Sequence, residues 1–77
     1  MSNYLTKLKK IISEKTGLEL ADITEDSYFE DDLNISEMEL MEILDEVEES
    51  LHVDISDERD SLESVGELLE LLSEKLD

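Results

Sequence analysis

The chain has 77 residues, with 24 acidic and six basic side chains, 39% apolar residues, and neither cysteine nor proline. This length predicts one domain over residues 1–77, which buries about 60 to 65% of its unfolded surface. The missing cysteines exclude disulfides, a thiolate nucleophile and a cysteine metal site, and no apolar run reaches the roughly 20 residues that span a membrane. The acid excess argues against nucleic acid as a partner. We therefore expect a cytoplasmic protein that is monomeric.

The first helix is predicted from about Asn3 to about Thr16. Apolar residues recur there at helical spacing, and Gly17 follows where a left-handed residue would end the helix. The stretch from Leu18 to Ile35 has no sustained period but contains spaced apolar residues, so we expect a loop packed on the core. Its expected anchors are Leu18, Leu20, Ile23, Tyr28, Phe29 and Leu33.

The second helix is predicted to begin after Ser36. Ser36 and Glu39 have the Ser-x-x-Glu spacing of a capping box. The apolar residues that follow form one buried stripe, namely Leu40, Ile43, Leu44, Val47 and Leu51. The rest of the helix surface is acidic.

Two further helices are predicted after residue 55. Ser56 opens a short third helix that ends near Leu62, and a second capping box at Ser64 and Glu67 opens a last helix that runs to about Lys75. No segment shows the alternation of a strand. The predicted fold class is therefore all-α, a bundle of three main helices plus one short helix.

These elements in this order resemble the acyl carrier protein family over nearly the whole chain. The local matches are Lys9-Lys10-Ile11-Ile12, Asp26-Ser27-Tyr28-Phe29, Asp31-Asp32-Leu33 and Val53-Asp54-Ile55-Ser56-Asp57-Glu58. The resemblance implies a carrier bundle whose second helix starts at a serine bearing 4′-phosphopantetheine. It also implies basic partner enzymes in fatty-acid, polyketide or related biosynthesis.

Matched without gaps from Lys9 to Glu58, the family's carrier serine falls on Glu37 and its preceding aspartate on Ser36. A carboxylate would give a labile mixed anhydride in place of a stable phosphodiester, so Glu37 cannot do the work of the serine. Ser36 is interpreted as a helix cap, and the alternative is a displaced phosphopantetheine attachment site that a phosphopantetheinyl transferase would modify. Glu37 is either a helix-favouring acid or a permanent imitation of the negative charge of the modified state.

The leading interpretation is an acyl-carrier-like domain that docks to basic surfaces of partner enzymes through its acidic second helix. The predicted docking residues are Glu37, Met38, Glu39, Met41, Glu42, Asp45, Glu48 and Glu49. The alternatives are a working carrier with its arm on Ser36 and, outside the family, a generic acidic helical interaction module. No enzyme is predicted, because the chain lacks a glycine-rich phosphate loop and its one histidine, His52, has no cysteine or metal-ligand spacing beside it.

Overall fold

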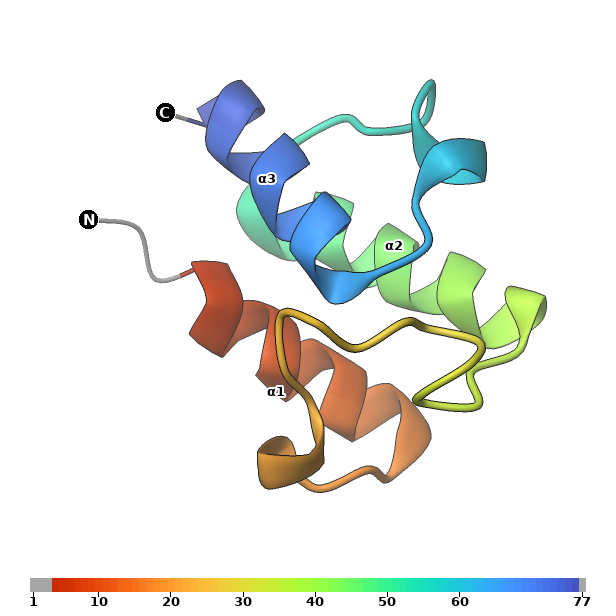
Figure 1. Ribbon diagram of the computed structural model, residues 1–77. Coiled ribbons are helices and arrows are strands. Elements are labelled where there is room, and N and C mark those ends of the chain that lie inside the picture. The colour runs from red at the N-terminus through yellow and green to blue at the C-terminus, as the bar shows by residue number, and fades with distance from the viewer. Residues whose placement is uncertain (1–3, 77) are drawn as a thin grey trace.

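Three α-helices joined by two long connections make up the computed structural model, which describes residues 4–76 (Figure 1). The helices are α1 (Tyr4–Thr16), α2 (Glu37–Leu51) and α3 (Val65–Leu76), with two 3₁₀ turns, η1 (Leu20–Asp22) and η2 (Arg59–Ser61). Within the described residues the structure has no strand, only an isolated bridge between Tyr28 and Ser64. The all-α prediction is confirmed. The predicted third helix is shorter than expected, a single 3₁₀ turn, and the predicted start at Asn3 lies outside the described residues.

The ends of the first two helices follow from local conformation. Gly17 closes α1 with a φ of 81° and donates its N–H to the Ser13 carbonyl at 2.8 Å. His52 closes α2 in the left-handed conformation and donates its N–H to the Glu48 carbonyl. Such left-handed residues satisfy the otherwise free carbonyls at a helix end. The last turn of α2 is thereby fixed without a glycine.

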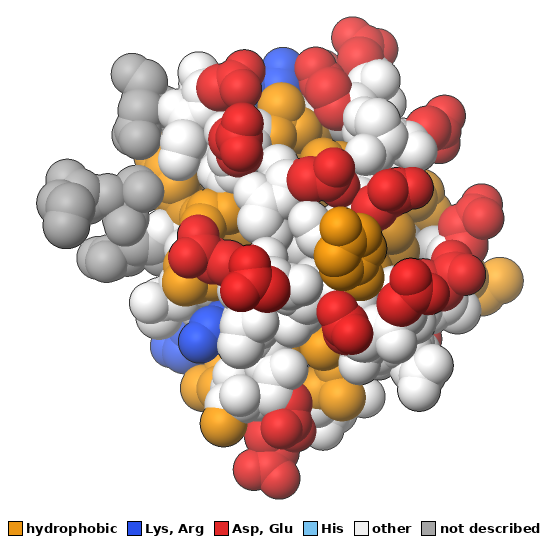
Figure 2. All heavy atoms as spheres, in the orientation of Figure 1, with side chains coloured by type: hydrophobic (Ala, Val, Ile, Leu, Met, Phe, Trp, Pro, Cys, Tyr) orange, Lys and Arg blue, Asp and Glu red, His pale blue; other side chains and the backbone are white. Residues whose placement is uncertain are grey.

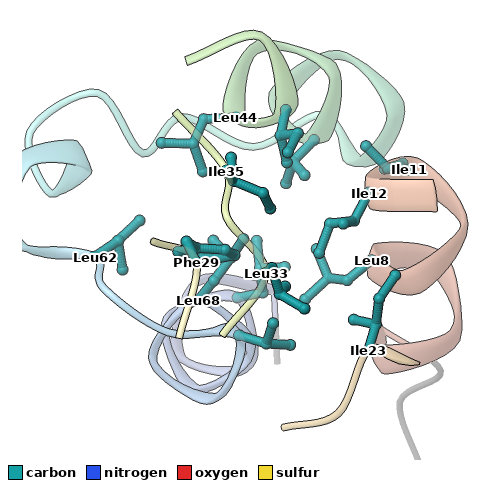
Figure 3. Close-up of a cluster of buried hydrophobic side chains, with 14 of the residues drawn as sticks. Leu8, Ile11, Ile12, Ile23, Phe29, Leu33, Ile35, Leu44, Leu62 and Leu68 are labelled. Carbon is teal, nitrogen blue, oxygen red and sulfur yellow. The ribbon is translucent and has the colours of Figure 1, made fainter. Parts of the chain in front are cut away.

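The core lies where one apolar stripe from each helix meets the long first connection (Figure 3). The helices supply Leu8, Ile11, Ile12, Ile43, Leu44, Val47, Val65, Leu68 and Leu72, and the first connection supplies Ile23, Phe29, Leu33 and Ile35. The loop is thus packed, as its spacing predicted. Two expected anchors are wrong, however, because Leu20 and Tyr28 are 48% and 49% exposed.

Backbone hydrogen bonds attach the first connection to the start of α3. Phe29 N–H donates to the Glu63 carbonyl at 3.0 Å, and Val65 N–H donates to the Ser27 carbonyl at 3.0 Å. Gly66 comes so close that a Cβ there would lie 2.9 Å from the Glu25 carbonyl oxygen. These bonds hold α3 against the segment that leads into α2.

The beginning of α1 and the end of α3 lie on one side of the molecule, and the first turn of α2 lies on the opposite side in Figure 1. The described part of the chain measures 28 × 25 × 19 Å along its principal axes. None of its helices combines the length and the apolar character that crossing a membrane would need. Acidic side chains are spread over the face shown in Figure 2, with few basic ones among them.

Candidate functional site

The site forms around the first turn of α2, where the predicted capping box is present. Ser36 is extended, with φ −72° and ψ 163°, and its Oγ accepts the Glu39 N–H at 3.1 Å. In return, Glu39 Oε1 accepts the Ser36 N–H at 3.1 Å. Just before it, Ile35 is buried and donates its N–H to the Phe29 carbonyl at 2.8 Å. The turn is therefore fixed by the core on one side and by the cap on the other.

Glu37 and Met38 open the helix and point away from the core. Glu37 is exposed, and the Met38 side chain is 75% exposed, more than any other large hydrophobic side chain among residues 4–76. A carboxylate at the first helical residue interacts favourably with the partial positive charge of a helix N-terminus. The structure thus presents a negative charge and an apolar side chain together at the tip of the molecule.

A pocket of about 400 Å³ lies beside this first turn, bounded by α2, the segment from Tyr28 to Asp31 and the η2 region. Phe29, Ile35 and Leu62 supply buried apolar walls. Glu37, Leu40 and Met41 line it from α2, and Arg59 lines it from η2. Met41 therefore both packs against the hydrophobic core and lines the pocket.

The acidic residues of α2 divide into exposed and internally engaged groups. Glu37, Glu42 and Glu49 are exposed, while Glu39 is engaged in the capping box. Glu46 accepts a hydrogen bond from the Ser50 hydroxyl at 2.9 Å and lies 3.8 Å from Lys15 Nζ. The predicted docking surface therefore contains exposed carboxylates and others that already have partners within residues 4–76.

Arg59 pairs with two of the predicted docking residues, a feature that the sequence analysis missed. Its Nη2 donates to Asp45 Oδ1 at 2.6 Å and to Glu48 Oε1 at 2.5 Å. The hydrogen bond to Asp45, followed by the hydrogen bond to Glu48 and the negative charge of Glu48, raises the pKa of Arg59 above its ordinary value, against the opposing effect of partial burial. Glu48 also accepts the Ile55 N–H at 2.8 Å through its other oxygen, Oε2. Glu48 therefore joins α2 to the following segment at two points.

The segment after α2 is shaped by a local turn. Asp54 Oδ1 accepts both the Ser56 hydroxyl, at 2.7 Å, and the Ser56 N–H, at 3.0 Å. These bonds, the hydroxyl first, lower the pKa of Asp54 below its ordinary value. Ser56 therefore lies in a local turn and does not cap a helix, and η2, whose N-cap is Glu58, is the helical turn that forms before Leu62.

Comparison with known proteins places this architecture in a family. A family model described as "Phosphopantetheine attachment site" matches residues 6–72. Acyl carrier proteins of Clostridium perfringens strains SM101, ATCC 13124 and 13 are each 35% identical to this chain over 69 residues, which is 88% of this chain and 91% of theirs. This chain belongs to the acyl carrier protein family. The predicted resemblance is confirmed.

The family's prosthetic group can be tested against the two candidate residues of this acyl carrier family member. The arm is a phosphodiester of a hydroxyl, and Glu37 has a carboxylate, so Glu37 does not fit the group. Ser36 has an exposed hydroxyl, but its oxygen lies at the N-cap and accepts the Glu39 N–H. The structure thus brings together Ser36, Glu37 and Met38 at one turn, and residues 37–40, the first turn of α2, contain no serine.

Proposed function

We propose that this acyl carrier family member acts as a docking domain that has no conventional carrier serine and binds basic partner enzymes through α2. The observation that carries the proposal is the exposed first turn, where Glu37 stands beside an exposed methionine. Glu42, Asp45 and Glu49 continue the exposed acidic surface along the same helix. A surface of this kind suits a partner that presents arginine or lysine around an apolar patch.

Binding would combine two physical effects. Carboxylates that are exposed and close together attract a basic surface before contact, which raises the association rate and makes it sensitive to salt. Met38, exposed at the tip, supplies an adaptable apolar contact once the surfaces meet. Glu37 supplies a fixed negative charge where a modified relative would have its phosphodiester, without any modification.

Intact mass spectrometry tests the missing arm. Incubated with coenzyme A and a phosphopantetheinyl transferase, the native protein should keep its mass. The variant Glu37→Ser should gain the mass of one phosphopantetheinyl group, because it restores a hydroxyl at the family position. If the native protein gains that mass and Ser36→Ala does not, the working-carrier alternative with its arm on Ser36 replaces the proposal.

A competition assay tests docking with the same transferase as the basic partner. Increasing amounts of this protein should slow modification of the Clostridium perfringens acyl carrier protein, and the effect should fade as salt is raised. The double variant Glu42→Gln/Glu49→Gln should weaken inhibition about threefold to tenfold, as expected for two peripheral ion pairs.

The matched control is Glu14→Gln/Glu74→Gln, which removes two exposed carboxylates from α1 and α3. It should leave inhibition nearly unchanged. Equal weakening by both double variants, together with no effect of Met38→Ala, would support the generic acidic module and contradict docking through α2. No inhibition by the native protein would contradict docking to this partner.

A further inference from the structure

Arg59 occupies part of the surface through which α2 is proposed to dock. It is the only lysine or arginine between positions 17 and 74. Besides its bonds to Asp45 and Glu48, its Nη1 lies 3.7 Å from the Met41 sulfur. These three contacts are spaced i, i+4 and i+7, so they form one stripe along the helix. A guanidinium group from the chain itself is therefore bound to the stripe next to the exposed acids.

We propose that Arg59 is an internal substitute for an arginine of the partner, and that docking exchanges one guanidinium for the other on Asp45 and Glu48. This inference rests on the proposed function, because it describes how the same surface is regulated. In the free protein, Arg59 competes with partners. In the complex, the partner's arginine holds the two carboxylates and Arg59 is released to solvent.

The geometry leaves room for such an exchange. The Arg59 side chain is 18% exposed, whereas that of Asp45 is 69% exposed and gives an incoming group a point of entry. Arg59 also uses its donors incompletely: both carboxylate bonds come from Nη2, and Nε is buried without a hydrogen-bond partner among residues 4–76. A buried donor without a partner weakens the net gain of an ion pair. A guanidinium that approaches side-on can use two nitrogens and bind better.

Release of Arg59 would loosen the segment that contains η2. This segment, residues 56–61, lies between the buried side chains of Ile55 and Leu62, and Lys75 holds it separately through Glu58 at 3.4 Å. The bond from Ile55 N–H to Glu48 Oε2 does not involve Arg59 and can persist. Since Arg59 also lines the pocket beside Glu37, occupation of the docking surface would change the wall of that pocket.

Binding of a fluorescent hexa-arginine peptide, measured by anisotropy at 0.15 M salt, tests the exchange. The variant Arg59→Lys keeps the charge but loses the planar fork, and should bind the peptide about twofold more tightly than the native protein. Arg59→Met should bind about fivefold more tightly, the value of one modest ion pair. Lys10→Met is the charge-matched control: this exposed α1 lysine makes no ion pair within residues 4–76, and its loss should change affinity by less than about twofold.

Hydrogen exchange supplies an independent readout in the native protein. The amides of Glu58, Ser61 and Leu62 donate to the carbonyls of Ile55, Glu58 and Arg59, in the η2 segment and at its two borders. Saturation with hexa-arginine should speed their exchange severalfold, and hexa-lysine should do so less, because an ammonium lacks the paired donors. Unchanged or slower exchange at these amides would overturn the proposal.

The possible failures are distinguishable. If the native protein, Arg59→Lys and Lys10→Met all bind the peptide with the same affinity, Arg59 does not compete with the peptide. This inference then fails, while docking through α2 stands. If Arg59→Met and Lys10→Met raise the affinity for the peptide equally, the gain in affinity comes from net charge alone, and the proposed exchange is overturned. If the peptide binds none of the variants, both the inference and docking to arginine-bearing partners fail.

Discussion

Replacement of Ser36 by alanine should weaken the start of α2 without changing the fold. The change removes the oxygen that accepts the Glu39 N–H at 3.1 Å, leaving that amide to water. Because the turn is exposed, water compensates in part, and the expected loss is about 1 kcal/mol in the free energy of unfolding. For a domain of this size, such a loss lowers the melting temperature by about 4 to 8 °C.

Urea and thermal unfolding followed by circular dichroism measure this effect. Ser36→Asn is the matched control, since asparagine caps helices as well as serine and leaves the charge unchanged, so it should stay within about 0.5 kcal/mol of the native protein. Ser64→Ala at the second capping box should cost more than Ser36→Ala, because Ser64 is only 9% exposed and water cannot easily replace its oxygen. Equal stability of the native protein and Ser36→Ala would refute the capping argument.

Three further outcomes are expected. The melting temperature should rise between 0.01 and 0.15 M salt, because the net charge of −18 makes the acidic side chains repel one another and the screening length falls from about 30 to about 8 Å. Calorimetry that finds no rise would contradict this. Gly66→Ala should cost about 1 to 3 kcal/mol in urea unfolding, since its Cβ would lie 2.9 Å from the Glu25 carbonyl oxygen, and a neutral change would mean that this close approach relaxes freely. Asp54→Asn should lower the melting temperature above pH 4, because the ionised Asp54 carboxylate accepts the two Ser56 hydrogen bonds. The difference between the variant and the native protein should disappear as pH falls through the depressed pKa of Asp54 in the folded state, where the carboxylate is protonated. A difference that persists at low pH would exclude this cause.

The helices were predictable because their signals are local. Ser36 with Glu39 marks the start of α2 within four residues, and Gly17 marks the end of α1. The last capping box, at Ser64 and Glu67, is also present, with Ser64 Oγ accepting the Glu67 N–H at 3.2 Å. Each of these features depends on neighbours along the chain, so propensity and spacing are sufficient.

The unpredicted features depend on residues far apart in the sequence. Arg59 binds Glu48 and Asp45, which lie 11 and 14 positions away, and the sequence around Arg59 does not indicate this pairing. The i, i+4, i+7 spacing of Met41, Asp45 and Glu48 could have indicated a common stripe, but not which cation would meet it. Tyr28 was expected inside as one of the spaced apolar residues of the first connection, yet its backbone pairs with Ser64, just before α3, and the residue is 49% exposed.

The positions of the start of α1 and the end of α3 have a practical consequence for measurement. The start of α1 and the end of α3 lie across the molecule from the first turn of α2 (Figure 1). A biotin tether, a dye or a reporter attached through a short linker beside the start of α1 or the end of α3 would therefore stand clear of Glu37 and Met38. Immobilised in this way, every molecule would present its acidic tip to a flowing analyte. Association and dissociation rates could then be measured with the proposed docking surface accessible throughout.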